Sequence, residues 1–337
     1  MALLPQDTAT AKTSDAQPLK HNEYSLATLT LAQLCQLKHE NIQHQHRFDV
    51  LLALRAALVT ASPPVTSEQA HRLVALARYL CDWPTLLDMQ NRGLWQASSA
   101  EKVQPEIQLG WFDLALAQVE NALQTHCYDM ELVITRQELQ HVIDTMPYPL
   151  AALKNGAVSL TPLQFYHVAD FGWQYGDAKI AQLCNLPLFP SAQHWINWLH
   201  QCQQEQQRHL FAVMHEDFGL IGSVSLQVFD GLGFFYYWLG SDFQGQGLGP
   251  KAVDILMRLG QRYLGMRCCY AKVFDYNPVS NRAIAKLGFE RLPFKALPPS
   301  ESEVFYFKGG KCSTNTHYQD LQTLLSDLNS DIHLVKT

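Results

Sequence analysis

Three glycines, Gly245, Gly247 and Gly249, lie in the stretch SDFQGQGLGP, between an aromatic run and a segment with helical spacing. Because glycine costs conformational entropy, such a cluster indicates that the backbone itself has a task. A strand that runs into glycines and then into a helix presents outward-pointing N–H groups and the positive end of a helix dipole, an arrangement that binds phosphate. Pro250 fits the first helical turn, where a missing N–H is no loss. The cluster therefore predicts a site for a phosphate-containing ligand.

The surroundings of the cluster disfavour the common nucleotide-binding loops. No Lys-Ser/Thr pair follows the glycines, as the phosphate loop of nucleotide triphosphatases requires. The turns HEDFG and FDGLG before the cluster favour antiparallel hairpins, whereas a dinucleotide fingerprint requires a parallel strand–helix–strand unit. A plain strand-to-helix turn is the alternative, although such a turn needs one glycine and not a spaced set.

The pattern Gln244-x-x-Gly247-x-Gly249 resembles the acyl-CoA signature of the GNAT acetyltransferase superfamily, Gln/Arg-x-x-Gly-x-Gly/Ala. The aromatic run FFYYWLG precedes it, and the pieces NPVS and KLGF follow it in the order of the family's blocks. Three earlier pieces are similar to the branch that includes the ribosomal-protein N-terminal acetyltransferases: VSLTPL, GDAKIAQLCNLPLFPSAQHWINWL and IGSVSL. The resemblance covers about residues 155–310 and leaves out the N-terminal half.

This resemblance implies that acetyl-CoA is the co-substrate. Backbone amides of the turn would hold its pyrophosphate, and the residues expected there are Gln244, Gly245, Gln246, Gly247, Leu248 and Gly249. Backbone groups of Leu239, at the end of the preceding strand, would bind the pantetheine arm and the thioester carbonyl in an oxyanion-hole role. By the same resemblance Asn277 would bind the pantetheine arm, or else merely begin the turn before Pro278.

The proton donor for the departing thiolate is expected to be Ser280. Many GNAT enzymes use a Tyr on the helix after the Asn, but Ile284 occupies that place here. In the ribosomal-protein branch a Ser three residues after the Asn lies near the sulfur, and Ser280 has that position. The alternative is that Ser280, near the start of a helix, caps its own backbone.

The general base is left open between several groups. The candidates are Asp275, at the end of a strand, Tyr237, on the central strand, and with less support Glu216, in a hairpin turn. Ordered water is a further alternative. An α-amine has a pKa about 2.5 units below that of lysine, which is worth about 3.5 kcal/mol, so a site for protein N-termini needs only weak base catalysis.

The acceptor pocket is expected opposite the coenzyme, in the segment FGWQYGDAK. Trp173, Gln174, Tyr175 and Asp177 are predicted to line it, although the aromatic side chains could instead belong to the core. Asp177 would attract a cationic amine.

The N-terminal half shows helical spacing from about residue 23 to residue 146. One face of a first helix, which ends at the run ASPP, is predicted to carry Phe48, Leu51, Leu52, Ala56 and Val59. The capping box Thr66-Ser67-Glu68-Gln69 begins a second helix. A third has the apolar stripe Phe112, Ala115, Leu116, Val119, Ala122 and Leu123, and with Gly110 it resembles the second helix of a tetratricopeptide repeat. Because Pro105 interrupts its partner, we predict a helical-hairpin domain, either plain scaffold or a peptide-binding surface.

After Pro149 the apolar period changes to that of strands. Strands are predicted at 158–160, 210–214, 220–228, 233–239, 268–274 and 303–308, with helices at 249–264 and 278–287. The chain is therefore predicted to be an α+β protein with four parts: a flexible tail at 1–22, an all-helical domain at 23–146, a mixed, mostly antiparallel sheet flanked by helices at 150–310, and a helical extension at 311–337.

Composition excludes several other classes of protein. With 337 residues, a net charge of −6 and no long Lys/Arg cluster, the chain is not expected to bind nucleic acid. No signal peptide or membrane span is found, so we expect a cytoplasmic protein without a membrane partner. The eight cysteines lack CxxC pairs, and His39, His44 and His46 match no standard ligand spacing, so no metal is expected.

Together these features predict an acetyl-CoA-dependent N-acetyltransferase that acts by direct transfer onto a primary amine of a protein or peptide. The helical half would recruit the acceptor or mediate self-association, for example as a homodimer. Two alternatives remain: an acetyltransferase for small-molecule amines, and a non-catalytic protein that senses acyl-CoA.

Overall fold

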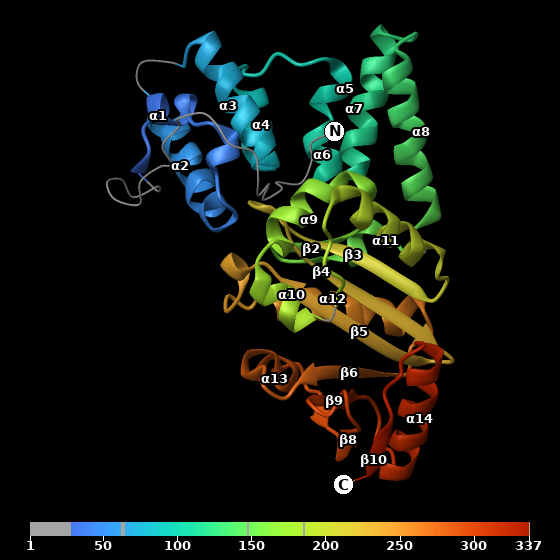
Figure 1. Cartoon of the computed structure of the whole chain (residues 1–337). Coiled ribbons are helices and arrows are strands. Elements are labelled where there is room, and N and C mark those ends of the chain that lie inside the picture. The colour runs from blue at the N-terminus through green and yellow to red at the C-terminus, as the bar shows by residue number, and fades with distance from the viewer. Residues whose placement is uncertain (1–27, 62–64, 147, 185, 337) are drawn as a thin grey trace.

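The computed structural model describes residues 28–61, 65–146, 148–184 and 186–336. The predicted tail at 1–22 lies outside these residues. Figure 1 shows a helical half at one end of the molecule and a sheet half, with helices on its faces, at the other. The predicted α+β class is confirmed. Among the described residues no helix is long and apolar enough to cross a membrane.

In the described part of the N-terminal half lie eight α-helices and two short 3-10 helices, η2 (His39–Asn41) and η3 (His44–His46). The α-helices are α1 (Leu31–Gln36), α2 (Arg47–Thr60), α3 (Ser67–Tyr79), α4 (Trp83–Asn91), α5 (Ser99–Lys102), α6 (Gln104–Gln108), α7 (Phe112–Thr125) and α8 (Met130–Thr145). The capping box at the start of α3 is confirmed. Gln69 N donates to Thr66 Oγ1 at 3.2 Å, and Thr66 N donates to Gln69 Oε1 at 2.9 Å. A helix start leaves four backbone N–H groups without a partner in the helix, and this capping box satisfies two of them.

The predicted face of α2 is only partly confirmed, because Leu51 is buried and Phe48 half-buried while Leu52, Ala56 and Val59 are exposed. Leu52 is 38% and Val59 is 83% exposed, whereas Leu54 and Leu58 are fully buried. The helix has apolar residues on more than one face, and the stripe that contains Leu51, Leu54 and Leu58 packs against α1, α3 and α4. Spacing alone could not decide which of two apolar stripes finds a partner.

The helical hairpin predicted around α7 is present. Phe112, Ala115 and Val119 of α7 are buried against Leu132 and Leu139 of α8. Pro105 lies in the first turn of the short helix α6. A peptide-binding role for this hairpin stays a prediction.

The sheet of the C-terminal half has the strand order β1-β2-β3-β4-β5-β6-β9-β7. Its strands are β1 (Lys154–Asn155), β2 (Val158–Pro162), β3 (Arg208–His215), β4 (Gly219–Phe229), β5 (Leu232–Leu239), β6 (Cys268–Phe274), β7 (Glu290–Arg291) and β9 (Glu303–Lys308). Neighbours pair antiparallel except β5 and β6, which are parallel. The six predicted strands are therefore confirmed, with longer limits for four of them.

Helices cover both faces of this sheet. One face packs on α12 (Leu248–Tyr263) and α13 (Pro278–Lys286), and the other on α9 (Val168–Tyr175), α10 (Ala178–Cys184), α11 (Ala192–Gln204) and α14 (Thr314–Asp327). Successive residues of β5 alternate between the faces, so that Phe235 and Leu239 join the core under α12 while Phe234 and Trp238 point the other way. Two predicted helices, α12 and α13, are confirmed.

The end of the chain differs from the expected helical extension. Helix α14 lies there, but β10 (Leu334–Lys336) follows it and pairs with β8 (Phe294–Ala296) in a separate two-stranded sheet. Leu334 is buried in one cluster with Phe294 and Ala296 of β8, whereas Val335 and Lys336 are exposed. The limits of the four parts of the chain stay a prediction.

A wedge opens between the two parallel strands. β5 and β6 pair only where Leu232–Phe234 lie beside Cys268–Tyr270. Beyond these residues the strands part, and residues 235–239 have β4 on one edge and no partner strand on the other. Because both strands run in the same direction, the wedge is at their C-terminal ends, and β5 continues from there through the short helix η6 (Ser241–Phe243) into the glycine turn.

The helical half is packed firmly on the sheet half. Trp83 Nε1 of α4 donates to Asp170 Oδ1 of α9 at 2.9 Å, and Trp173 Nε1 of α9 donates to the Tyr79 carbonyl at 2.9 Å. Trp173 also lies edge-on to Tyr79, with ring centroids 5.5 Å apart. Hydrogen bonds of buried indoles specify one relative placement of the two halves, because each unpaired donor would carry a desolvation cost.

Candidate coenzyme and transfer site

The glycine turn faces outward. Gly245 and Gly247 both have φ of +75°, in the left-handed region that favours glycine, and a Cβ at either would meet no atom within 4 Å. No described residue accepts a hydrogen bond from the backbone N–H groups of residues 245–247. Gly247 is the N-cap of α12, whose first N–H groups also lack a partner within the helix. The turn and the helix start thus form a concave set of free donors that suits a phosphate group.

Gly249, the third glycine, is required for a different reason. It is buried in the first turn of α12, and a Cβ there would lie 3.0 Å from Tyr237 Cε2. The ring of Tyr237 therefore packs directly against the start of the helix. Tyr237 joins the glycine turn to the interior of the wedge.

Gln244 holds the end of β5. Its Nε2 donates to the Leu239 carbonyl at 2.9 Å. In an extended strand the N–H and C=O of one residue point to the same edge. The Leu239 N–H therefore points to the open edge of the wedge, where its carbonyl is already occupied by Gln244.

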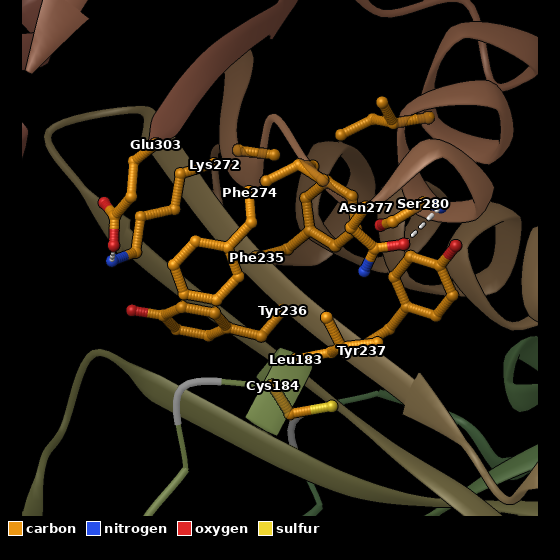
Figure 2. A pocket seen from close by; sticks show the side chains of 13 residues that line it. Leu183, Cys184, Phe235, Tyr236, Tyr237, Lys272, Phe274, Asn277, Ser280 and Glu303 are labelled. Carbon is orange, nitrogen blue, oxygen red and sulfur yellow. Dashed lines mark hydrogen bonds and ion pairs between the residues drawn. The ribbon is translucent and has the colours of Figure 1, made fainter. Parts of the chain in front are cut away.

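A pocket of about 60 Å³ lies in the wedge. Figure 2 shows its lining: aromatic side chains of β5 and β6 form the walls, and the first turn of α13 closes one end. Leu183 and Cys184 of α10 contribute from the opposite face of the sheet. Burial raises the pKa of the Cys184 thiol to about 12, so this group is protonated at neutral pH.

Asn277, Ser280 and Tyr237 meet at the α13 end of the pocket (Figure 2). Asn277 is the N-cap of α13, and its Oδ1 accepts from Ser280 N at 3.1 Å. Because Asn277 caps the helix through the Ser280 N–H, the Ser280 hydroxyl is left to face Tyr237, which lines the same end of the pocket. Burial raises the pKa of Tyr237, and the neighbouring Ser280 side chain opposes that rise. Two protonated hydroxyls therefore lie side by side in the wedge.

Residues 158–290 match the family model described as "Acetyltransferase (GNAT) domain". This part of the chain is a GNAT acetyltransferase domain. The resemblance predicted from the glycine pattern is thereby confirmed, and the chain contains a domain of the acyltransferase class.

Several solved structures are similar to the GNAT domain. The microcin C7 self-immunity acetyltransferase MccE, in complex with acetyl-CoA and AMP, is 18% identical, with a TM-score of 0.42 over 48% of this chain and 99% of its own. The ribosomal L7/L12 alpha-N-protein acetyltransferase RimL is 17% identical, with a TM-score of 0.42 over 48% and 93%. A ribosomal-protein-S5-alanine acetyltransferase from Vibrio fischeri is 17% identical, with a TM-score of 0.41 over 46% and 94%. No curated protein matches the chain in sequence.

The candidate bases are not all in the pocket of the GNAT domain. Tyr237 lines it, as described. Asp275 follows β6 with an exposed side chain outside the lining, and its N–H donates to the Ser302 carbonyl at 2.7 Å. Glu216 lies in the turn between β3 and β4 and is also exposed. The roles of these residues stay predictions.

The residues expected to bind the acceptor lie outside the pocket lining. Trp173 is buried against the helical half, and the Tyr175 hydroxyl donates to the Leu186 carbonyl at 3.2 Å within an aromatic cluster. Gln174 is buried with its Oε1 against Gly240. Asp177 Oδ1 accepts from Lys179 N at 2.9 Å at the start of α10. Their part in acceptor binding stays a prediction, and the aromatic residues fit the core-packing alternative.

An ion pair at the other end of the pocket was missed. Lys272 Nζ of β6 lies 2.7 Å from Glu303 Oε1 of β9, and both side chains are largely buried. Figure 2 shows this pair at the opposite end from Asn277 and Ser280. In the register of the two strands Phe274 opposes Glu303 and Lys272 opposes Phe305, which puts both charges on one face. The sequence signal for this ion pair was the presence of a charged residue, Lys272 or Glu303, in each of two largely apolar strands. Only the register of the strands shows that the two residues contact each other.

The described residues contain no cluster of three or more His, Cys, Asp or Glu side chains that could hold a metal ion.

Proposed function

We propose that this protein transfers an acetyl group from acetyl-CoA to a primary amine of a protein or peptide, by direct transfer. Residues about 150–310 would form the transferase domain, and residues 23–146 the helical domain. The observation that carries the proposal is the connection made by Tyr237, whose ring touches Gly249 of the glycine turn while Ser280 lies beside it in the lining of the same pocket. An anion site and a proton-donating pair are thus joined by one side chain.

The glycine turn holds the diphosphate of the coenzyme through the free N–H groups of Gly245, Gln246 and Gly247. The dipole of α12 adds about 0.3–1 kcal/mol to the binding of a negative group at its N-terminus. The Asn277 side chain, across the wedge from the open edge of β5, binds the pantetheine arm. Gln244 keeps the Leu239 carbonyl out of the way by occupying it.

Transfer proceeds by attack of the amine nitrogen on the thioester carbon. A C–N bond forms, the C–S bond breaks, and the amine loses one proton while the thiolate gains one. Ser280 or Tyr237 supplies the proton to the thiolate, since burial keeps the pKa of Tyr237 above its usual value. The Leu239 N–H offers the hydrogen bond that stabilises the oxyanion of the tetrahedral intermediate.

The state of the Cys184 thiol supports direct transfer, without an acyl group bound covalently to the enzyme. Cys184 lines the pocket, but a thiol with a pKa near 12 has almost no thiolate at neutral pH, and the thiolate is the nucleophile. All eight cysteines lie among the described residues and are unpaired, which supports a cytoplasmic location.

The acceptor we favour is an α-amine. Glu303 is the one carboxylate among the residues that line the pocket, and it is paired with Lys272. A site without a free carboxylate suits an amine of which about half is already neutral near pH 8, and the α-amine has this property whereas lysine does not. The small-molecule amines remain a second class of acceptor to be tested.

The test is incubation with acetyl-CoA and three sets of amines: peptides with free N-termini, N-terminally blocked lysine peptides, and small amines. Intact mass detects the acetylated product, and a thiol reagent detects release of coenzyme A. We expect N-terminal peptides to gain one acetyl group. The buried Ile284, in place of the family's Tyr, favours the second candidate, a sensor of acyl-CoA. A sensor would bind coenzyme A in calorimetry and release no thiol above background with any amine.

A further inference from the structure

Helix α2 of the helical half reaches the connection that leads into the glycine turn. The ring of Phe48, in the first turn of α2, lies 5.6 Å from that of Phe243 at an angle of 87°, and 5.4 Å from that of Phe218. Phe218 and Phe243 are themselves 5.6 Å apart. These three rings, which we call the Phe triad, join α2 to the β3–β4 turn and to η6. Edge-to-face and tilted contacts at these distances are favourable for aromatic pairs.

Phe243 is the apolar anchor of the connection between β5 and the turn. It is 1% exposed, whereas its neighbours Ser241 and Asp242 in η6 are exposed. Gln244, which holds the Leu239 carbonyl, comes next, and Gly245 follows. Since no atom lies within 4 Å of a Cβ built on Gly245 or Gly247, the turn itself has little packing of its own. Its conformation therefore depends on how firmly its two ends are held.

Helix α2 is in turn fixed to its surroundings by two arginines. Arg47 is buried, donates from Nε to the Leu80 carbonyl at 2.9 Å, and lies over the Trp173 ring. Arg55, two turns further along, pairs with Asp82 and donates to the carbonyl of Asp217, the residue before Phe218. Its guanidinium also lies 5.1 Å from the centroid of Phe218. The helix thus holds both the β3–β4 turn and η6.

We infer that α2 is part of the coenzyme site, and that Phe48 is a positioning residue which holds Phe243 so that the glycine turn keeps its N–H groups aligned for a diphosphate. This inference rests on the proposed binding of acetyl-CoA at the turn. It gives the helical half a role in binding the coenzyme, in addition to any role in acceptor recruitment. Whatever displaces α2 also weakens the coenzyme site.

The first test compares Phe48→Ala with the wild-type protein by calorimetry with coenzyme A at fixed ionic strength. We expect the Kd to rise about tenfold, within the range of couplings between linked sites. Phe48→Leu should recover most of the affinity, because leucine refills the apolar gap beside Phe243. The matched control is Val50→Ala, which removes a buried side chain of the same helix that packs in the helical core. It should lower the melting temperature and leave the Kd unchanged.

The second test uses reciprocity. If α2 and the turn are coupled, coenzyme A must stabilise α2 as α2 stabilises the site. Hydrogen exchange in peptides from residues 47–60 of the wild-type protein should therefore slow on addition of coenzyme A. A merely structural Phe48 would give no such change. This measurement decides the matter even if Phe48→Ala does not fold.

The two ideas fail in different ways. Tight binding by the wild-type protein, with the same Kd for Phe48→Ala and no slowing of exchange in residues 47–60, would overturn the inference and leave the proposed function intact. Absence of binding by the wild-type protein would overturn the proposed function, and the inference with it.

Discussion

Gly247→Ala tests the anion site most directly. An L-residue in the left-handed conformation costs about 1–2 kcal/mol relative to glycine. The added methyl group meets no atom within 4 Å, so packing contributes nothing to the penalty. Because the backbone at Gly247 is exposed and has no packing of its own, the variant escapes the strain by rotating this backbone, and the rotation turns the N–H groups away. The penalty then appears in binding: coenzyme A should bind about 5- to 30-fold more weakly, with the free energy of unfolding nearly unchanged.

The assay is calorimetric titration with coenzyme A, together with chemical denaturation of the same samples at constant ionic strength, since salt screens phosphate binding. Gly265→Ala is the matched control. Gly265 has φ of +67° and an equally open Cβ position, but it lies beyond the far end of α12, whose 16 residues span about 24 Å. Gly265→Ala should bind coenzyme A normally. Equal affinity of Gly247→Ala and wild type, or equal weakening of the two variants, would refute the reasoning.

Three further outcomes are expected. Ser280→Ala and Tyr237→Phe each lower kcat by about 100-fold, the lower range for general acid catalysis, and the double variant loses little more because both hydroxyls serve the same proton transfer; steady-state kinetics that showed fully multiplicative losses would contradict this. Lys272→Met or Glu303→Gln lowers the free energy of unfolding by about 3–5 kcal/mol, since a buried charge loses its partner, and the double change to apolar residues restores most of it in urea denaturation; a fully stable single variant would speak against a buried pair. Burial raises the pKa of Asp170 to about 6, above its value of 3.8 in the unfolded chain, so the folded form binds more protons between these pH values and loses roughly 3 kcal/mol of stability as the pH rises through them. Asp170→Asn should lack this loss when the free energy of unfolding of both proteins is measured at pH 4 and at pH 7, and an identical pH dependence of the two proteins would rule the explanation out.

Much of the coenzyme side of the site could be predicted from the sequence, because it depends on local conformation. The spaced glycines, the strand before them and the helix after them are neighbours along the chain, and backbone preferences alone place Gly247 at the start of α12. The N-cap of Asn277 on α13 is local in the same sense. The limits of β6 could also be predicted, because a short apolar run between polar turns fixes where a strand begins and ends.

The remaining features depend on contacts between distant segments. The approach of Tyr237 to Ser280 requires β5 and β6 to part after Phe234, which no periodicity encodes. The Lys272–Glu303 pair depends on the register between two strands whose paired residues are 31 positions apart in the sequence. The predicted face of α2 was wrong at Leu52, Ala56 and Val59, because two apolar stripes compete and the neighbouring helices decide which one is buried. The sequence around aromatic residues such as Trp173 does not show whether the side chain packs between the two halves of the molecule or lines a substrate pocket.

The residues proposed to contact the coenzyme directly come from one uninterrupted run of chain, whereas Phe48 would act on them from outside that run. Tyr237, Leu239, Gln244, the glycine turn, Asn277 and Ser280 all belong to β5, α12, β6, α13 and their connections. The opposite face is covered by α9–α11, which come from an earlier segment. Under the proposed function, substitutions or insertions in that earlier segment would change the acceptor specificity and leave the residues that handle the thioester unchanged, so a new specificity would need no new chemistry.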